Sequence, residues 1–168
     1  MDLEVVQPPN PTGKKKRAQG KRSDHNHQEV NFLEQHKKNI DDGEAGELLV
    51  QSYERELLQA AGRGDLAIQV QRTCDMPEHG NAAPFDIRSY EVDGTEKYIE
   101  VKTTRGAASA PFFLSEQERQ FFLSHKAQYY LYRVCSYRPE QGHAKLFILR
   151  DIEEECVLSP FQYVVTLR

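Results

Sequence analysis

The sequence predicts an α/β fold with a mixed central sheet flanked by helices. The predicted order is helix, three strands, helix and strand, with one or two extra strands at the C-terminal end. Two observations support this class. Segments with apolar residues at helical spacing alternate with short segments rich in β-branched and aromatic residues. An Asp-Gly turn at 93–94 joins two alternating segments, and this is a strong hairpin signal because glycine tolerates positive φ. A length of 168 residues suits one domain with a sizeable core.

Residues 1–39 are expected to form a disordered basic arm, and residues 40–168 the folded domain. Prolines near the N-terminus break any helix, and apolar residues are scarce in the arm. Its basic clusters at 14–17 and 21–22 fit a nucleic-acid tether, a nuclear-import signal or a solvated tail. The arm holds eight Lys/Arg against five Asp/Glu, whereas residues 40–168 hold 14 against 21. The folded domain is therefore acidic, which is not typical of a high-affinity DNA binder.

No apolar run approaches the ~20 residues that span a bilayer, and the N-terminus has no apolar signal-peptide core. We therefore expect no membrane association and a cytoplasmic location, or a nuclear one in a eukaryote because of the basic arm. Cys74, Cys135 and Cys156 lie far apart and match neither a disulfide framework nor a zinc pattern. They are expected to be reduced packing residues.

The first helix is expected to start near Ile40 and to stop at the glycines of 62–64, where left-handed backbone is favoured. Small and apolar residues recur at helical spacing from Gly46 to Ala60 and predict a packing face. Glu47 lies at the border of this face. It either reaches a site on the adjoining sheet or is a surface acid that complements the helix dipole.

The strands that follow include the predicted hairpin. Alternation predicts a strand over 66–73 and, after a loop, a hairpin with strands 85–90 and 97–104. Because side chains alternate along a strand, Glu100 and Lys102 share one face of the second hairpin strand.

Ser115 begins the second helix, because Ser115 and Glu118 form a Ser-x-x-Glu capping box. The remaining predicted elements are a central strand at 128–137, a strand antiparallel to it at 143–150, a short irregular or helical piece at 152–160 and a final strand at 162–167. Three tyrosines of the central strand, Tyr129, Tyr130 and Tyr132, fit either base stacking or a core, and the core is favoured.

Two carboxylates and a lysine on the hairpin suit metal-dependent cleavage of a phosphodiester. Mg²⁺ is usually held by one or two carboxylates, which Asp86 and Glu100 would supply, with the backbone carbonyl of Val101 as a third ligand. Mn²⁺ is the alternative ion. Lys102 would stabilise the attacking hydroxide or the developing oxyanion, and Glu47 would orient a water or help to hold a second metal. A charged strand face that is merely solvated has the same pattern.

The chain also resembles a known family. Its five motifs, in order, are GEAGELLVQSYE, PFDIRS, YIEVKTT, PFFLSEQE and YYLYRV. They are similar to those of the family named after the C-terminal domain of the plant protein NO VEIN, over about residues 40–150. That family in turn resembles the PD-(D/E)xK restriction-endonuclease-like nucleases, in particular the Mrr-like members.

The resemblance implies a restriction-endonuclease-like core of α-β-β-β-α-β order. Carried over to this sequence, it places Asp86, Glu100 and Lys102 on the catalytic positions of the superfamily and Glu47 on its helix-borne acid.

The resemblance also places Ser115 and Glu118 on a further family motif, for which the capping box indicates a structural role. The chain departs from the family at Pro84, where a glycine is common, and at Arg119, where an aromatic residue is common. These departures affect loop shape and substrate fit rather than the metal ligands.

Two functions follow as expectations. The first is a Mg²⁺-dependent endonuclease that hydrolyses DNA in defence against foreign DNA or in DNA processing. The second is a catalytically silent nuclease-fold module that binds nucleic acid or a protein. RNA is not distinguished from DNA as a substrate. Family members are often fused to helicase or ATPase modules, and because the chain has no Walker-type loop, such a motor would be a separate partner. A homodimer would pair two sites for cutting both strands.

Overall fold

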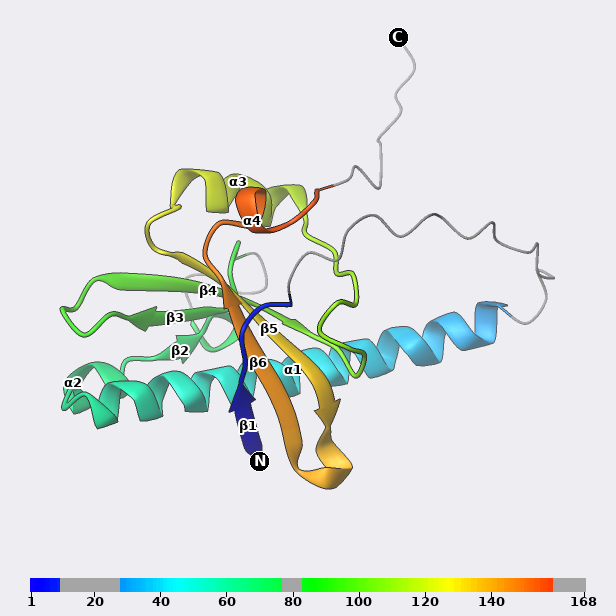
Figure 1. Cartoon of the computed structure of the whole chain (residues 1–168), viewed down its shortest axis with the longest axis horizontal. Helices are drawn as coiled ribbons and strands as arrows, with labels where there is room; N and C mark the ends of the chain where they lie inside the picture. Colours follow the sequence, from blue (N-terminus) through cyan, green and yellow to red (C-terminus); the bar gives the residue numbers. More distant parts are fainter. Residues whose placement is uncertain (10–27, 77–82, 159–168) are drawn as a thin grey trace, which may run out of the picture.

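The computed structural model describes residues 1–9, 28–76 and 83–158. The strands of these segments form one mixed sheet in the order β1-β6-β5-β4-β3-β2, in which β1/β6 and β4/β5 pair parallel and the other neighbours antiparallel (Figure 1). The strands are β1 (Asp2–Val5), β2 (Gln71–Arg72), β3 (Ile87–Tyr90), β4 (Glu96–Thr103), β5 (Tyr129–Arg138) and β6 (His143–Leu149).

Helices cover both faces of the sheet. The helices are α1 (Gln28–Ala60), α2 (Gly64–Ala67), α3 (Glu116–Ser124) and α4 (Ile152–Glu155), with short 3-10 turns at Thr73–Asp75 and Pro139–Gln141. Helices α1 and α2 lie on one face, while α3 and α4 lie on the other (Figure 1). The predicted α/β class, with a mixed sheet flanked by helices, is confirmed.

Each face of the sheet has its own apolar core. Val50 and Leu58 of α1 pack with Ile99 and Val101 on one face. Phe122 of α3 packs with a second group on the other face, which comprises Tyr129, Leu131, Cys135, Phe147, Leu149 and Ile152. Tyr129, Tyr130 and Tyr132 are 0%, 9% and 1% exposed, so the core interpretation of these rings is confirmed.

The predicted hairpin is present as β3 and β4. Ile87 pairs with Ile99 in an antiparallel register, and the turn contains Gly94 at φ 95°. The side chain of Asp93 accepts a hydrogen bond from the N–H of Thr95 at 2.8 Å, which stabilises the turn. The capping box of α3 is also confirmed: the side chain of Ser115 accepts from the backbone of Glu118, and the side chain of Glu118 accepts from the backbone of Ser115.

The expected disordered arm at 1–39 needs correction at both of its ends. Asp2–Val5 form β1 beside β6, and the N–H groups of Asp2 and Val6 donate to carbonyls of Gly142 and Leu146. This pairing gives the edge of β6 a hydrogen-bonded neighbour. The scarcity of apolar residues in the arm gave no indication of this strand. Helix α1 begins at Gln28 rather than near residue 40. Residues 10–27, which hold the basic clusters, lie outside the described residues.

Two further expectations differ from the structure. The predicted strand over 66–73 is largely wrong, because Leu66 and Ala67 are buried in α2 and only Gln71–Arg72 pair as β2. Weak alternation over eight residues also fits a short helix that buries two neighbours. The final strand expected at 162–167 lies outside the described residues.

The packing face of α1 is more polar than its apolar spacing predicts. Leu57 is 45% exposed, whereas Gln51 and Glu54 are buried. Gln51 Nε2 donates to the Val70 carbonyl at 3.1 Å, and Glu54 bonds to Lys97. Within the three described segments, no helix is long and apolar enough to cross a membrane.

Candidate functional site

The hairpin brings Asp86 and Glu100 close together. Ile87 and Ile99 are register partners and point into the core beside α1, and they form the last pair of the register at this end of the hairpin, next to Asp86 and Glu100. The N–H of Asp86 donates to the Ile99 carbonyl at 2.9 Å, which holds this end of the pairing. The charge of Asp86 acts on Glu100 and raises the pKa of its carboxyl. The two carboxylates therefore lie near each other.

Val101 contributes its backbone to the same place. The Asp86 carboxylate accepts a hydrogen bond from the Val101 N–H at 2.7 Å. In an extended strand the N–H and C=O of one residue point to the same side. The Val101 carbonyl therefore faces the Asp86 side of β4, next to the two carboxylates.

Lys102 lies between two carboxylates. Its Nζ is 2.6 Å from Glu100 Oε1 and 3.1 Å from Glu118 Oε2. The same Oε2 atom of Glu118 accepts the Ser115 N–H at 2.8 Å. Glu118 was expected only to cap α3, and the structure shows that it also holds Lys102. The face of β4 that carries Lys102 looks towards α3, which brings Glu118 into contact with Lys102.

The carboxyls of Asp86 and Glu100 have raised pKa values. Burial raises the pKa of Glu100 well above its ordinary value, and the charge of Asp86 adds to this effect. Burial also raises the pKa of Asp86 to about 6, although the Val101 N–H and the charge of Lys102 act in the opposite direction. Because two buried acids repel each other when both are ionised, a cation between them would stabilise both charges.

Lys102 keeps its proton in this arrangement. Burial alone would lower the pKa of Lys102, but the charges of Glu100 and Glu118 and their hydrogen bonds outweigh burial and raise it. The ammonium group is therefore suited to stabilise negative charge and not to accept a proton.

Glu47 lies at the border of the cluster. Burial raises the pKa of Glu47 to about 7, the charge of Asp86 raises it further, and the charge of Arg72 lowers it. Its ion-pair partner is Arg72, whose Nη1 is 3.8 Å from Glu47 Oε2. Among the described residues, Glu47 makes no hydrogen bond to Asp86, Glu100 or Lys102. The structure thus brings Asp86, Glu100 and Lys102 into one cluster and couples Glu47 to it through charge.

The place of Glu47 depends on a close contact between α1 and β4. A Cβ atom added to Gly46 would lie 1.9 Å from Thr103 Oγ1, so only glycine allows this approach. The neighbouring residue Glu47 is consequently held near the end of β4 that carries Lys102.

Two more residues, which the sequence did not single out for the site, belong to its surroundings. The hydroxyl of Tyr129 is buried and makes no hydrogen bond within the described part of the chain. Burial and the charges of Glu100, Glu118 and Asp86 all raise the pKa of Tyr129, so its hydroxyl stays protonated near the carboxylates. A buried donor without a partner is unusual unless water or a ligand completes it.

Arg133 is the second such residue. It is 2% exposed, and its guanidinium donates to the carbonyl of Lys102 at 2.9 Å and to that of Ala110 at 3.3 Å. No carboxylate pairs with Arg133 among the described residues. The sequence around Arg133 is that of an aromatic strand, and it did not indicate that this strand would bury a cationic side chain.

The donor set fits a hard divalent cation. Within residues 1–9, 28–76 and 83–158, no three His, Cys, Asp or Glu side chains gather at one place where they could hold a metal ion. The available donors are therefore two carboxylates and a backbone carbonyl. All are oxygen atoms, which suits Mg²⁺ or Mn²⁺ with water completing the octahedron and argues against zinc.

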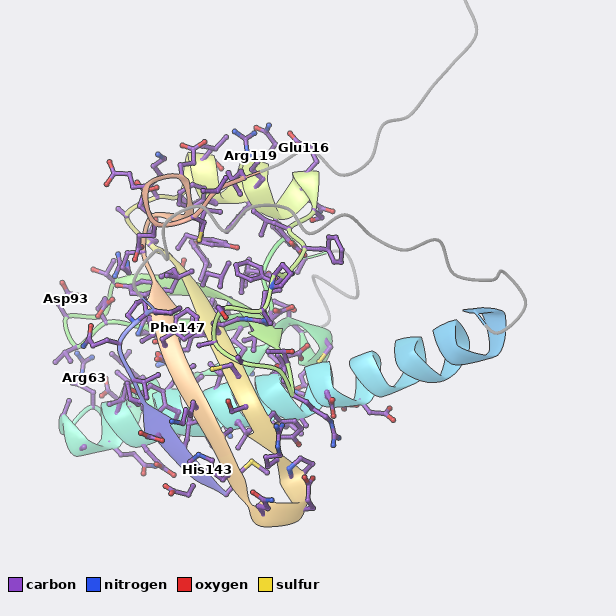
Figure 2. The ribbon with its side chains drawn as sticks, turned by 45° about the vertical axis from the view of Figure 1, so that its right-hand side comes forward. Arg63, Asp93, Glu116, Arg119, His143 and Phe147 are labelled. Atoms are coloured by element: carbon purple, nitrogen blue, oxygen red, sulfur yellow. The ribbon has the colours of Figure 1, made fainter. Side chains whose placement is uncertain are left out.

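Arg119, one of the two residues at which the sequence departs from the motifs it resembles, lies outside this cluster. Figure 2 shows Arg119, with Glu116, on the outer surface of α3. Arg119 Nη2 donates to Glu153 Oε1 at 3.1 Å, which ties α3 to α4. The contacts of Lys102 are made by Glu100 and Glu118 and do not involve Arg119.

Comparison with known proteins places the chain in a family. Residues 46–149, more than half of the chain, match the family model described as "Protein NO VEIN, C-terminal". This range contains Glu47, Asp86, Glu100 and Lys102. No curated protein and no solved structure matches the chain significantly. The chain therefore belongs to the NO VEIN C-terminal family.

Proposed function

We propose that the chain is a metal-dependent endonuclease that hydrolyses phosphodiester bonds of DNA. The observation that carries this proposal is the cluster on β3 and β4, in which Asp86 and Glu100 repel each other beside the protonated Lys102. Two neighbouring acids with raised pKa values are typical of a site that binds a cation. A lysine beside them can stabilise the negative charge of the transition state.

Asp86, Glu100 and the Val101 carbonyl would hold Mg²⁺ or Mn²⁺. When bound, the metal would polarise a phosphoryl oxygen and lower the pKa of a water molecule. The chain itself keeps the ligands in place, because the Val101 N–H fixes the Asp86 carboxylate at 2.7 Å and the Ile99 carbonyl fixes its backbone. The Tyr129 hydroxyl, which makes no hydrogen bond among the described residues, offers a further donor near the carboxylates.

Lys102 and Glu47 would have separate roles in the reaction. The Lys102 ammonium group would donate to an anionic oxygen of the phosphate, while Glu118 keeps its Nζ in position. Glu47, whose pKa is about 7, would accept a proton from water near neutral pH, where such transfer is most effective.

The second candidate function is a catalytically silent module that binds nucleic acid or a protein such as a helicase or ATPase. It is favoured by the acidic balance of residues 40–168 and by the engagement of Lys102 with two carboxylates. On this alternative the charged cluster stabilises the hairpin against α3. Either function is compatible with a role in defence or DNA processing.

Plasmid nicking separates the two functions. Supercoiled DNA is incubated with the wild-type chain in Mg²⁺, in Mn²⁺ or in a chelator, and compared with Asp86→Asn and Lys102→Ala. The matched control is Asp93→Asn, which changes an acid of the same hairpin at the turn, away from the cluster. Removing one metal ligand or the charge-stabilising lysine is expected to slow nicking by at least about 10²-fold, while Asp93→Asn cuts like wild type.

The endonuclease is rejected when wild type leaves DNA intact in both metals, or when Asp86→Asn cuts as fast as wild type. RNA and single-stranded substrates are included so that a different polymer is recognised by its faster cleavage. Unchanged circular dichroism of each variant shows that lost nicking is not lost folding.

A further inference from the structure

Aromatic side chains form a partly exposed cluster next to Asp86 and Glu100. Phe121 stacks on His125 with centroids 4.0 Å apart, and both rings meet Tyr98 edge-on at 5.2 and 5.4 Å. Phe85 closes the cluster at 4.9 Å from Tyr98. We call Tyr98, Phe121 and His125, which are all partly exposed, the aromatic shelf. It joins β4 to α3 at the edge of the candidate site.

An arginine lies beside the aromatic shelf. Arg88 is the register partner of Tyr98, so it shares the face of the hairpin that carries Glu100. The pair of Arg88 and Tyr98 is two residues further along the strands than the carboxylates, a shift of about 6.6 Å. The shelf and the arginine therefore lie about one nucleotide of extended chain away from the candidate metal ligands.

Arg88 makes few polar contacts among the described residues. Its Nη2 donates to Gln71 Oε1 at 3.3 Å, and its Nε is buried without a hydrogen bond among the described residues. It makes no ion pair within the described segments, whereas Arg63 and Arg119, which are also partly exposed, pair with acids. A partly buried guanidinium that lacks an anion is poised to bind one from outside, and phosphate matches its geometry.

The shelf has one acid at its end. Glu96 Oε2 accepts a hydrogen bond from the Tyr98 hydroxyl at 2.7 Å, and this bond, together with burial and the charge of Glu96, raises the pKa of Tyr98 to about 12. The phenol is therefore neutral, and its hydroxyl is turned towards Glu96. The ring remains an apolar surface, and Glu96 lies on the side of Tyr98 opposite to the carboxylate pair.

From this geometry we propose that the aromatic shelf and Arg88 bind single-stranded DNA, with an unpaired base on the rings and its phosphate on the guanidinium. A base can stack on an aromatic ring only when the face of the base is open, as it is in a single strand. Such stacking adds affinity without requiring many cationic side chains. This suits residues 40–168, in which 21 Asp and Glu outnumber 14 Lys and Arg, because binding of duplex DNA relies on many phosphate contacts from Lys and Arg. The proposal rests on the proposed function, since it supplies the substrate for the same site.

Fluorescence anisotropy of the full chain with a labelled thymidine oligonucleotide tests this proposal. Ca²⁺ replaces Mg²⁺ so that binding is measured separately from cleavage. The variants are Arg88→Gln, Tyr98→Phe and Tyr98→Leu, and the control is Arg63→Gln, which removes an arginine remote from the shelf near Asp93 (Figure 2). Duplex DNA of the same length and a uridine oligoribonucleotide are titrated in parallel.

The wild type is expected to bind the single strand at least tenfold more tightly than the duplex. Tyr98→Leu weakens binding about tenfold or more through the loss of stacking, whereas Tyr98→Phe, which keeps the ring, binds like wild type. Arg88→Gln weakens binding and reduces the slope of log K against log salt by about 0.7, the value for one phosphate on a single strand. Arg63→Gln changes neither quantity.

Equal binding of duplex and single strand overturns the proposal, as does wild-type binding by both Tyr98→Leu and Arg88→Gln. Tighter binding of the oligoribonucleotide overturns the assignment to DNA. Because no cleavage is needed, the result is independent of plasmid nicking. If the single strand binds through the aromatic shelf but no substrate is cleaved, the proposed endonuclease activity is rejected and the proposed binding of single-stranded DNA is retained.

Discussion

The carboxylate of Glu118 serves two parts of the molecule. Its Oε2 atom accepts the Ser115 N–H at 2.8 Å and lies 3.1 Å from Lys102 Nζ. The first contact satisfies a free donor at the start of α3, and the second helps to keep Lys102 protonated. The stability of α3 and the charge state of the candidate site thus depend on one side chain.

Glu118→Gln separates these two roles. The amide oxygen of glutamine still accepts the Ser115 N–H, so the melting temperature is expected to remain near that of wild type. The loss of one negative charge lowers the pKa of Lys102, because the neighbouring carboxylate had raised it. Nuclear magnetic resonance titration of the Lys102 side chain measures this pKa, and an unchanged value contradicts the assigned contact.

Glu47 makes stability depend on pH. Its pKa is about 7 in the folded chain against an ordinary 4.5, so the folded state favours the protonated form. The penalty for ionising Glu47 is absent below pH 4.5, develops as the pH rises, and is complete above pH 7. Glu47→Gln is therefore expected to stabilise the metal-free chain at pH 8 by up to about 3 kcal/mol and to have little effect at pH 4.5.

Chemical unfolding in a chelating buffer at both pH values checks this effect. Glu44→Gln is the matched control, because Glu44 lies 3.7 Å from the same Arg72 but is 67% exposed. Destabilisation of Glu47→Gln at pH 8 would mean that the Arg72 ion pair outweighs burial.

At the scale of elements, one glycine sets the distance between α1 and β4. A Cβ atom on Gly46 would lie 1.9 Å from Thr103 Oγ1, and that hydroxyl is buried without a hydrogen bond among the described residues. Gly46→Ala is expected to force the elements apart and to destabilise the chain by about 1–3 kcal/mol.

Gly43→Ala is the control in the same helix. An added Cβ atom on Gly43 meets nothing within 4 Å, so this variant is expected to gain about 0.5–1 kcal/mol from helix propensity. Chemical unfolding measures both variants. Equal effects of the two substitutions contradict a close approach at Gly46.

A buried ion pair joins α1 to the hairpin on the face opposite the candidate site. Lys97 Nζ is 2.9 Å from Glu54 Oε2, which also accepts the Ser89 hydroxyl at 2.8 Å, and the Tyr132 hydroxyl donates to Glu54 Oε1. Every charge here has a partner, so the group specifies how α1 lies on the sheet.

Glu54→Leu leaves Lys97 buried without its partner, and we expect it to cost about 3–5 kcal/mol in unfolding free energy. The double variant Glu54→Leu/Lys97→Met is expected to recover most of this loss, because no charge remains buried. Asp65→Ala, at the exposed Arg63 pair, is the control and should change stability by less than about 1 kcal/mol. A small effect of Glu54→Leu would show that water reaches Lys97.

Sequence patterns predicted the elements that are decided locally. The Asp-Gly turn, the Ser-x-x-Glu cap and the aromatic strand β5 each carry their own signal within a few residues. Patterns failed where a distant partner decides: Gln51 and Glu54 are buried because they meet Val70 and Lys97. The spacing of apolar residues in the sequence does not indicate which polar residues will meet such partners.

The whole molecule shows the same division. Strand β1 exists because β6 offers it a parallel edge, and β6 lies more than a hundred residues later in the chain. The candidate residues Asp86, Glu100 and Lys102 were predictable because one hairpin carries all three. Glu118 and Arg133 were not predictable as their neighbours, since the β4–α3–β5 crossover brings them there.

The proposed function depends above all on the binding of a metal ion by Asp86 and Glu100, which only the assembled sheet brings together. Calorimetric titration of Mn²⁺ into the full chain tests it most directly, with Glu100→Gln as the test variant and Glu96→Gln, an exposed acid of the same strand, as the control. We predict saturable binding that releases protons near pH 6, because Asp86 and Glu100 must ionise to hold the ion. Binding is lost in Glu100→Gln and retained in Glu96→Gln. Absence of binding by wild type, or undiminished binding by Glu100→Gln, would contradict the metal site.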